Sequence, residues 1–156
     1  MRYFIQKLQE ILNITQYRRD IAESTTMSMQ NLEQDILNDL EQLHDPMDQY
    51  SFLVACAGEC LSYPEDYRND QFFIRECQVN TWVYTDMVDE GCVFFADSES
   101  LIVKGILALM QEIYFGRSPE EIRKHELKLL QSPVICSHLN PEQWKGLHAI
   151  AVRLKK

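Results

Sequence analysis

The chain has 156 residues, of which 46% are apolar and 25% charged, a composition that fits one globular domain and excludes a disordered or collagen-like chain. The net charge is −9, and residues 28–76 carry all of this excess, with eleven acidic groups against two basic ones. Such a surface would repel nucleic acid and anionic lipid, so we expect neither nucleic acid nor membrane as a partner, whereas a basic protein would be attracted.

The first 29 residues are expected to be an extension of the domain. Phe4, Ile5 and Leu8 recur at helical spacing, which predicts an amphipathic helix over 3–20, and a Ser/Thr-rich linker over 24–28 follows. We therefore expect a helical extension and linker over 1–29 and one domain over 30–156. No apolar signal-peptide segment opens this sequence, and five cysteines occur without repeating spacing, so we expect free thiols and a cytoplasmic location.

Two helices are predicted next, over 30–43 and from residue 46 to about residue 61. Leu32, Ile36 and Leu40 form the apolar face of the first helix, and its acidic residues, Glu33 among them, are expected to form a solvated face. Asp45-Pro46 is typical of a helix start, because Asp caps the free amides and Pro suits the first turn.

Three short segments with strand character follow, over 71–75, 79–85 and 92–95. They predict a small antiparallel sheet of about three strands, with a turn at 89–91 between the last two. Alternation places Trp82 and Val83 on opposite faces, and we expect Trp82 to be largely buried.

The rest of the chain is predicted to be helical. A helix over 101–114, capped by Asp97 or Ser98, should stop at Gly116. Ser118-Pro119 and Asn140-Pro141 each open a capping box, and the last helix should end near Lys155. The fold class is therefore α+β, with a small sheet flanked by N-terminal and C-terminal helices, and no alternation of strand and helix supports a parallel sheet.

Motifs of common enzyme classes are missing from the sequence. It has no glycine-rich phosphate loop, no Gly-x-Ser-x-Gly and no His-Glu-x-x-His. Cys56 and Cys60 lie one helical turn apart, but no second pair completes four metal ligands, so core packing is the better interpretation and no metal is expected. Cys92 and Cys136 are likewise expected to be small buried hydrophobic residues.

Cys77 lies between two predicted strands, where a loop would present its thiol to another protein. Arg75 would lower the pKa of this thiol and Glu76 would raise it. The residues alone leave a structural and a functional role for Cys77 equally open.

Five motifs resemble those of the SufE family of sulfur-acceptor proteins, in order and spacing, between Asn31 and Lys155. Cys77-Gln78 followed by Trp82 resembles the family's Gly-Cys-Gln-Ser-x-Val-Trp signature. The other four are Leu61-Ser62-Tyr63-Pro64-Glu65-Asp66-Tyr67-Arg68, Ala96-Asp97-Ser98-Glu99-Ser100-Leu101-Ile102-Val103-Lys104-Gly105, Gly116-Arg117-Ser118-Pro119-Glu120-Glu121-Ile122, and His138-Leu139-Asn140-Pro141 with Gly146-Leu147.

The resemblance implies a fold shared with IscU-type scaffolds and a role in sulfur transfer. Members bind a pyridoxal-phosphate cysteine desulfurase, accept its persulfide sulfur on one cysteine, and pass it toward an iron–sulfur scaffold complex. Cys77 stands at the acceptor position, no cofactor is expected on this chain, and pyridoxal phosphate belongs to the partner. Residues expected to contact the partner are Arg75, Glu76, Gln78, Asp97, Ser98, Glu99 and His138.

The sequence departs from the family pattern around the acceptor position. Glu76 replaces the glycine before the cysteine, and its charge would disfavour a thiolate on Cys77. Gln143 replaces an arginine and Gln131 a glutamate, while Glu99 keeps the acidic character of its motif. The alternative function is a regulator or diverged paralogue that binds a desulfurase but carries no sulfur.

Overall fold

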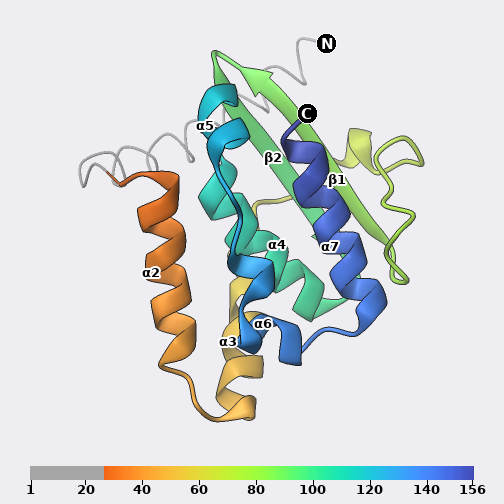
Figure 1. Cartoon of the computed structure of the whole chain (residues 1–156). Helices are drawn as coiled ribbons and strands as arrows, with labels where there is room; N and C mark the ends of the chain where they lie inside the picture. The colour runs from red at the N-terminus through yellow and green to blue at the C-terminus, as the bar shows by residue number, and fades with distance from the viewer. Residues whose placement is uncertain (1–26) are drawn as a thin grey trace.

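Helices and one antiparallel hairpin make up residues 27–156, the part of the chain that the computed structural model describes (Figure 1). The predicted helix over 3–20 lies outside the described residues, and the division at residue 29 stays a prediction. The elements are α2 (Met29–Glu41), α3 (Pro46–Gly58), β1 (Thr81–Val88), β2 (Gly91–Ser98), α4 (Leu101–Tyr114), α5 (Pro119–Lys124), α6 (Pro133–Ser137) and α7 (Pro141–Leu154), with short 3₁₀ turns at Glu65–Tyr67 and Leu129–Gln131.

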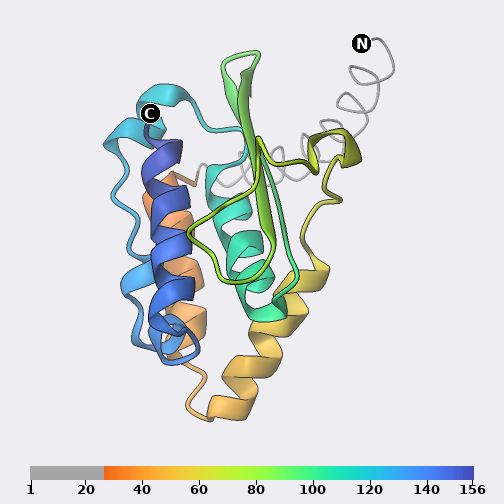
Figure 2. The same cartoon turned by 90° about the vertical axis from the view of Figure 1, so that its right-hand side faces the viewer.

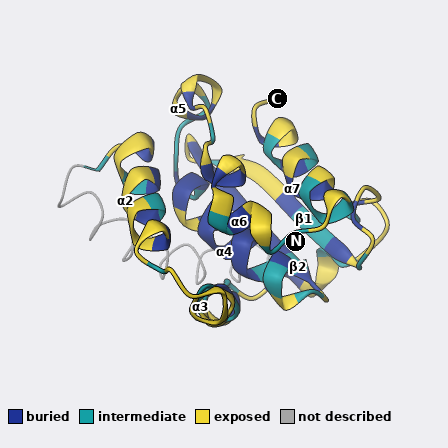
Figure 3. Cartoon of the chain, turned by 60° about the horizontal axis from the view of Figure 1, so that its bottom comes forward, coloured by how far each residue is buried: buried dark blue, intermediate teal, exposed yellow. Residues whose placement is uncertain are grey.

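Helix α4 is the centre of the core, as its run of apolar residues requires. Ile106, Leu107 and Met110 are fully buried, and α4 packs against α3, β2, α2 and α7 (Figure 3). The predicted bounds of this helix are confirmed, but the predicted cap is wrong. Ser100, not Asp97 or Ser98, is the N-cap, and its hydroxyl accepts a hydrogen bond from the Val103 amide at 3.3 Å.

The other helix starts follow the predicted capping signals. Asp45 caps α3, and Ser118 and Asn140 form complete capping boxes at the starts of α5 and α7. Gly116 has a φ of 81° just after α4, a left-handed conformation that favours glycine. Among the helices between residues 27 and 156, none has the length and apolar character that crossing a membrane requires.

Strands β1 and β2 pair in antiparallel register, with Thr81 opposite Ser98 and Val88 opposite Gly91. Figure 2 shows the hairpin edge-on, with helices on one side and the segment that follows α3 on the other, while its turn projects beyond them. Phe94 faces the main core with the helices, whereas Phe95 belongs to a second apolar cluster under the segment that follows α3. Strand β2 is therefore buried almost throughout, which explains why its sequence is apolar at consecutive positions.

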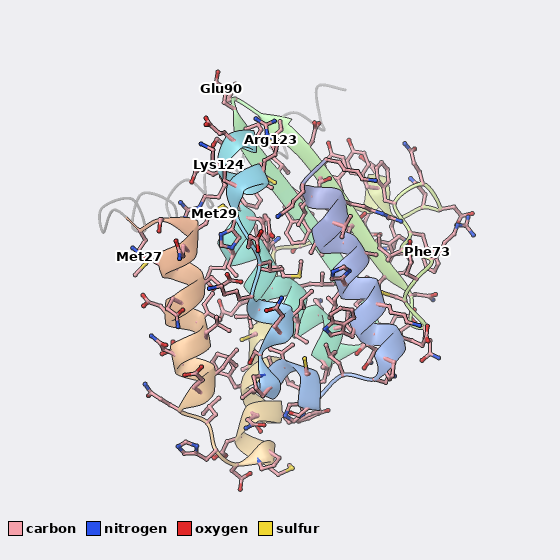
Figure 4. The ribbon with its side chains drawn as sticks, viewed as in Figure 1. Met27, Met29, Phe73, Glu90, Arg123 and Lys124 are labelled. Carbon is pink, nitrogen blue, oxygen red and sulfur yellow. The ribbon has the colours of Figure 1, made fainter. Side chains whose placement is uncertain are left out.

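The prediction of about three strands is corrected to two strands and an isolated bridge. Phe73 pairs with Trp82 on the free edge of β1 (Figure 4), and the Ile74 amide donates to the Thr81 carbonyl at 2.8 Å. A loop over 75–80 then returns the chain directly into β1. On the other side of Phe73 the chain turns at residues 69–72, where the Phe72 amide donates to the Asn69 carbonyl at 3.2 Å, so the pairing ends before it forms a third strand.

Trp82 is half-buried, which is less burial than predicted. Its ring packs edge-on against Phe73 at 5.7 Å, and the Arg68 guanidinium lies over it at 4.8 Å from the ring centre. The Arg68 cation above one ring face leaves the indole less buried than packing on a helix would. The face that packs on the helices carries Val83.

Glu33 is buried, although its position in the pattern predicted a solvated face. Its carboxylate accepts hydrogen bonds from the Lys128 and Leu129 amides at 2.9 and 3.0 Å, and His125 Nε2 lies 3.1 Å from its other oxygen. These amides come from the segment between α5 and α6, nearly a hundred residues later in the chain. Periodicity within α2 cannot predict a partner so distant in the sequence.

Candidate functional site

Cys77 lies in the loop over 75–80, yet its side chain points inward and is only 7% exposed. Its sulfur packs against α7 at Gly146, where a methyl group would come within 2.2 Å of Sγ. The predicted loop is confirmed. The sequence also predicted that this loop presents the thiol at the surface, whereas in the structure the thiol is buried. Glycine at position 146 is therefore what makes room for the buried thiol.

The loop is attached at both ends to the hairpin. At its start, the Ile74 amide bonds to the Thr81 carbonyl, and the Cys77 amide donates to the Ile74 carbonyl at 3.3 Å. At its end, the Glu99 amide donates to the Asn80 carbonyl at 3.0 Å, and the Asn80 side chain donates to the Glu99 carboxylate at 3.1 Å. The structure thus brings Glu99 next to the loop that carries Cys77.

Glu76 forms an ion pair with Arg153 in the last turn of α7, with Nη2 at 3.0 Å and 3.4 Å from the two carboxylate oxygens. Burial is the main cause that raises the pKa of the Cys77 thiol above its ordinary value of 9.0. A hydrogen bond with Thr81 lowers this pKa, the Glu76 charge raises it, and the Arg153 charge lowers it. The effect of Glu76 that the sequence predicted is real, but Arg153 opposes it.

Asp97 joins the hairpin to neighbouring segments, and Ser98 joins its two strands. The Asp97 carboxylate lies 2.8 Å from Arg68 Nη2 and 3.2 Å from Lys104 Nζ. The Ser98 hydroxyl is buried and lies 2.9 Å from the Thr81 hydroxyl. Both side chains are therefore engaged in contacts within this chain.

Asp97→Asn is expected to lower the free energy of unfolding by about 1 kcal/mol at neutral pH. Burial acts to raise the pKa of Asp97, but hydrogen bonds and charges from Arg68 and Lys104 outweigh it and hold the pKa below 3.8. Because this pKa is lower in the folded than in the unfolded state, the ionised carboxylate stabilises the folded protein. The stabilisation is fully present above the pKa of the unfolded state and is lost as the pH falls through the pKa of the folded state. The difference between wild type and variant in urea unfolding should therefore shrink below about pH 4. Equal destabilisation of Asp97→Asn at low and neutral pH would contradict this prediction. Asp70→Asn is the control, because Asp70 is an exposed carboxylate.

The remaining residues predicted to contact a partner divide into two groups. Arg75 and Gln78 are exposed on either side of the buried thiol. His138 does not join them: its Nε2 lies 3.1 Å from Gln49 Oε1, and its ring packs near Tyr50 on α3. The structure therefore places His138 with α3 and not with the loop that carries Cys77.

The other cysteines differ in their surroundings. Burial is the main cause that raises the pKa of Cys56 and of Cys60 to about 11 and the pKa of Cys92 to about 12. Cys136 is exposed, which corrects the prediction that it is buried, because the five-residue helix α6 presents it to solvent. Within residues 27–156, no group of three or more His, Cys, Asp or Glu side chains is arranged to hold a metal ion.

Similarity to known proteins covers most of the chain. The family model described as "SufE: Fe-S metabolism associated domain" matches residues 34–156. The chain belongs to the SufE family. A curated relative, the "Cysteine desulfuration protein SufE" of Wigglesworthia glossinidia brevipalpis, is 26% identical over 111 residues, which are 70% of this chain and 77% of the relative.

The fold matches a solved structure as well. The solution structure of a hypothetical protein from Thermus thermophilus has a TM-score of 0.66 and 19% identity, and the match covers 80% of this chain and 90% of that one. At this identity the likeness concerns the fold alone. It confirms the α+β fold class that the SufE resemblance implied.

The SufE-like motifs do not assign two residues of this site. Gly146 lies within one motif without a role of its own, and Arg153 lies outside all five motifs. The two residues are seven positions apart, which places them on one face of α7, two turns from each other. This spacing was the available signal, but only the fold shows that the face meets Glu76 and Cys77.

Proposed function

We propose that this SufE-family protein accepts sulfur from a cysteine desulfurase on Cys77 and passes it toward iron–sulfur cluster assembly. The observation that carries the proposal is the position of Cys77. It stands on the loop between the isolated bridge at Phe73 and strand β1, in the one of the five motifs that contains a cysteine, and exposed polar residues, Arg75 and Gln78, flank it. The family's association with Fe–S metabolism and the name of the curated relative support the kind of partner.

The proposed reaction is a thiol–persulfide exchange. The Cys77 thiolate attacks the outer sulfur of a persulfide on the desulfurase, and the sulfur–sulfur bond of that persulfide breaks. The desulfurase cysteine leaves as a thiolate, and the proton released by Cys77 restores it to a thiol or passes to solvent. Cys77 then carries the persulfide with no net oxidation. A second exchange of the same type transfers the sulfur to a scaffold complex or another acceptor.

The buried position of Cys77 adds a requirement to this reaction. Its sulfur packs on Gly146, and burial raises its pKa, so the closed loop offers little thiolate to a large partner. Reaction therefore requires that the loop over 75–80 moves away from α7. Such a movement would relieve the burial that raises the pKa and would expose the nucleophile in the same step.

The partner surface proposed here centres on the loop. Arg75 and Gln78 are exposed at its flanks, and Glu76 and Glu99 are exposed beside them. Contacts of Asp97, Ser98 and His138 with the partner remain part of the proposal, but their present hydrogen bonds give them positioning roles in this chain first. Pyridoxal phosphate is expected on the desulfurase, and none is needed on this chain.

Mixing the full chain with a cysteine desulfurase and free cysteine tests the proposal. We expect intact-mass spectrometry to find an adduct of one sulfur atom, and peptide mapping to place it on Cys77. Cys77→Ala should abolish the adduct and the stimulation of the desulfurase. Cys136→Ser is the matched control, because Cys136 is the exposed thiol and would take up sulfur first if access alone decided.

Two outcomes would overturn this function, and a third would exclude the desulfurase tested. An adduct on Cys136 or Cys56 that survives Cys77→Ala means that another thiol is the acceptor. A stable complex without any adduct favours the regulator that carries no sulfur. Absence of both complex and adduct excludes the desulfurase tested as the partner. Because Cys77 is buried, Cys77→Ser is expected to cost about 1–2 kcal/mol of stability by burying a hydroxyl, so Cys77→Ala is the cleaner variant.

A further inference from the structure

The loop over 75–80 touches α7 at two neighbouring points. The Cys77 sulfur packs on Gly146, and the Glu76 carboxylate pairs with Arg153 two helical turns further along α7. In Figure 2 the segment that contains this loop extends from the hairpin toward α7. The loop is thus held at its ends by Thr81 of β1 and by Glu99, which follows β2, and at its middle by α7.

The contacts at the ends and those at the middle differ in kind. Backbone hydrogen bonds hold the ends, from Ile74 to Thr81 and from Glu99 to Asn80. The middle is held by the packing of the Cys77 sulfur on Gly146, by the ion pair between Glu76 and Arg153, and by one hydrogen bond of 3.3 Å from the Cys77 amide to the Ile74 carbonyl. Moving Cys77 out of its site would leave the contacts of Thr81 and Asn80 in place, but it would break this hydrogen bond and the ion pair.

We propose that Arg153 is a positioning residue, which holds the Cys77 loop closed against α7 through its ion pair with Glu76 and so limits how often the thiol is exposed. This inference rests on the proposed function only in naming Cys77 as the acceptor. Neither Glu76 nor Arg153 touches the reacting sulfur in the role assigned here. Their effect is on the balance between a closed and an open loop.

The size of the effect follows from the exposure of the pair. The side chains of Arg153 and Glu76 are 53% and 41% exposed, so solvent screens their attraction. Exposed ion pairs contribute little, and loss of one should shift the loop toward the open form by about two- to fivefold. A shift of this size changes the rate at which a reagent or partner reaches the Cys77 thiol, while the domain stays folded.

Hydrogen exchange of the Cys77 amide, followed by NMR on the full chain, measures loop opening directly. This amide is hydrogen-bonded to the Ile74 carbonyl in the closed loop and is protected there. Arg153→Gln and Glu76→Gln should each speed its exchange by about two- to fivefold. Added salt should speed exchange in the wild type but not in these variants, because only the wild type has the pair to screen.

Two further variants separate the ion pair from other effects of the substitutions. Lys155→Gln removes a positive charge from the same end of α7, where the structure gives no ion pair with Glu76, and it should leave exchange at Cys77 unchanged. The charge-swapped double variant, Glu76→Arg with Arg153→Glu, should return exchange toward the wild-type rate. Unfolding in urea confirms that each variant still folds.

Unchanged exchange in Arg153→Gln, or equal acceleration in Lys155→Gln, would overturn the inference. Failure of the charge swap to restore protection would overturn it too, because the charges alone would then not explain the closure. None of these results depends on a desulfurase. If exchange responds as expected but no persulfide forms on Cys77, the proposed function fails while the role of Arg153 in closing the loop stands.

Discussion

Gly105→Ala is expected to lower the free energy of unfolding by about 2 kcal/mol or more. A methyl group at position 105 would lie 2.0 Å from the carbonyl oxygen of Leu53 and 2.9 Å from its carbonyl carbon. Both atoms belong to the backbone of α3, so no side-chain rotation relieves the overlap, and α3 and α4 must move apart. Overpacking of this kind costs about 1–3 kcal/mol or more, while alanine gains about 1 kcal/mol of helix propensity over glycine.

Urea unfolding of the variant, with circular dichroism as the readout, measures this change. Gly58→Ala is the matched control, because a methyl group at position 58, the last residue of α3, meets nothing within 4 Å. This control should be neutral or slightly stabilising. A Gly105→Ala variant as stable as the control would show that α3 and α4 adjust their crossing without loss of packing, against the close contact described above.

A motif can contain Gly105 without showing why a glycine is needed at that position. In the sequence, Gly105 is the last residue of the motif that starts at Ala96, and the resemblance to the family gives no physical reason for it. The physical reason for the glycine is the crossing of two helices whose contact residues, Gly105 and Leu53, lie far apart in the chain. A single sequence does not show that contact, because it arises from tertiary packing.

Features set by local interactions were predicted well. The helix over 101–114 and the capping boxes at Ser118 and Asn140 depend on residues within one or two turns, and they are confirmed. Features set by distant contacts were predicted poorly. Glu33 is buried because amides at 128 and 129 reach it, and Trp82 is covered by Arg68, not by a helix.

The same division holds at the candidate site. The motif located Cys77 between segments that pair at the edge of the hairpin, since strand character is visible in a short stretch of sequence. The buried state of its thiol was not predicted, because it depends on Gly146 and α7, about seventy residues later. The sequence set the charge of Arg75 against that of Glu76, but the structure pairs Glu76 with Arg153 of that same helix.

Gly146→Ala is expected to drive the Cys77 thiol out of its buried position and to speed its alkylation by about tenfold or more. The added methyl group would lie 2.2 Å from Sγ and 3.3 Å from both Cα and Cβ of Cys77. Sulfur cannot stay at that distance from carbon, and rotation of Sγ alone leaves the other two contacts tight. The loop over 75–80 must therefore shift outward with its thiol.

Two consequences of this shift increase reactivity together. Exposure gives the reagent access to the sulfur, and loss of burial removes the main cause that raises the pKa of Cys77 above 9.0, so more thiolate is present at neutral pH. The stability of the domain should change little, because alanine in the middle of α7 gains about 1 kcal/mol, which offsets the lost packing of one sulfur atom. Alkylation with iodoacetamide, resolved by peptide mass spectrometry over the cysteines, measures the rate at each thiol.

The rate at Cys136, which is already exposed, serves as the internal reference, and Gly58→Ala should leave the rate at Cys77 unchanged. If Gly146→Ala instead lost about 2 kcal/mol or more of stability while Cys77 kept its slow alkylation, α7 would have moved and the loop would have stayed. That outcome would make the loop the more rigid of the two elements. It would also contradict the proposal that the loop over 75–80 moves away from α7 for reaction, because an added methyl group displaces whichever of the two packed elements is held more weakly.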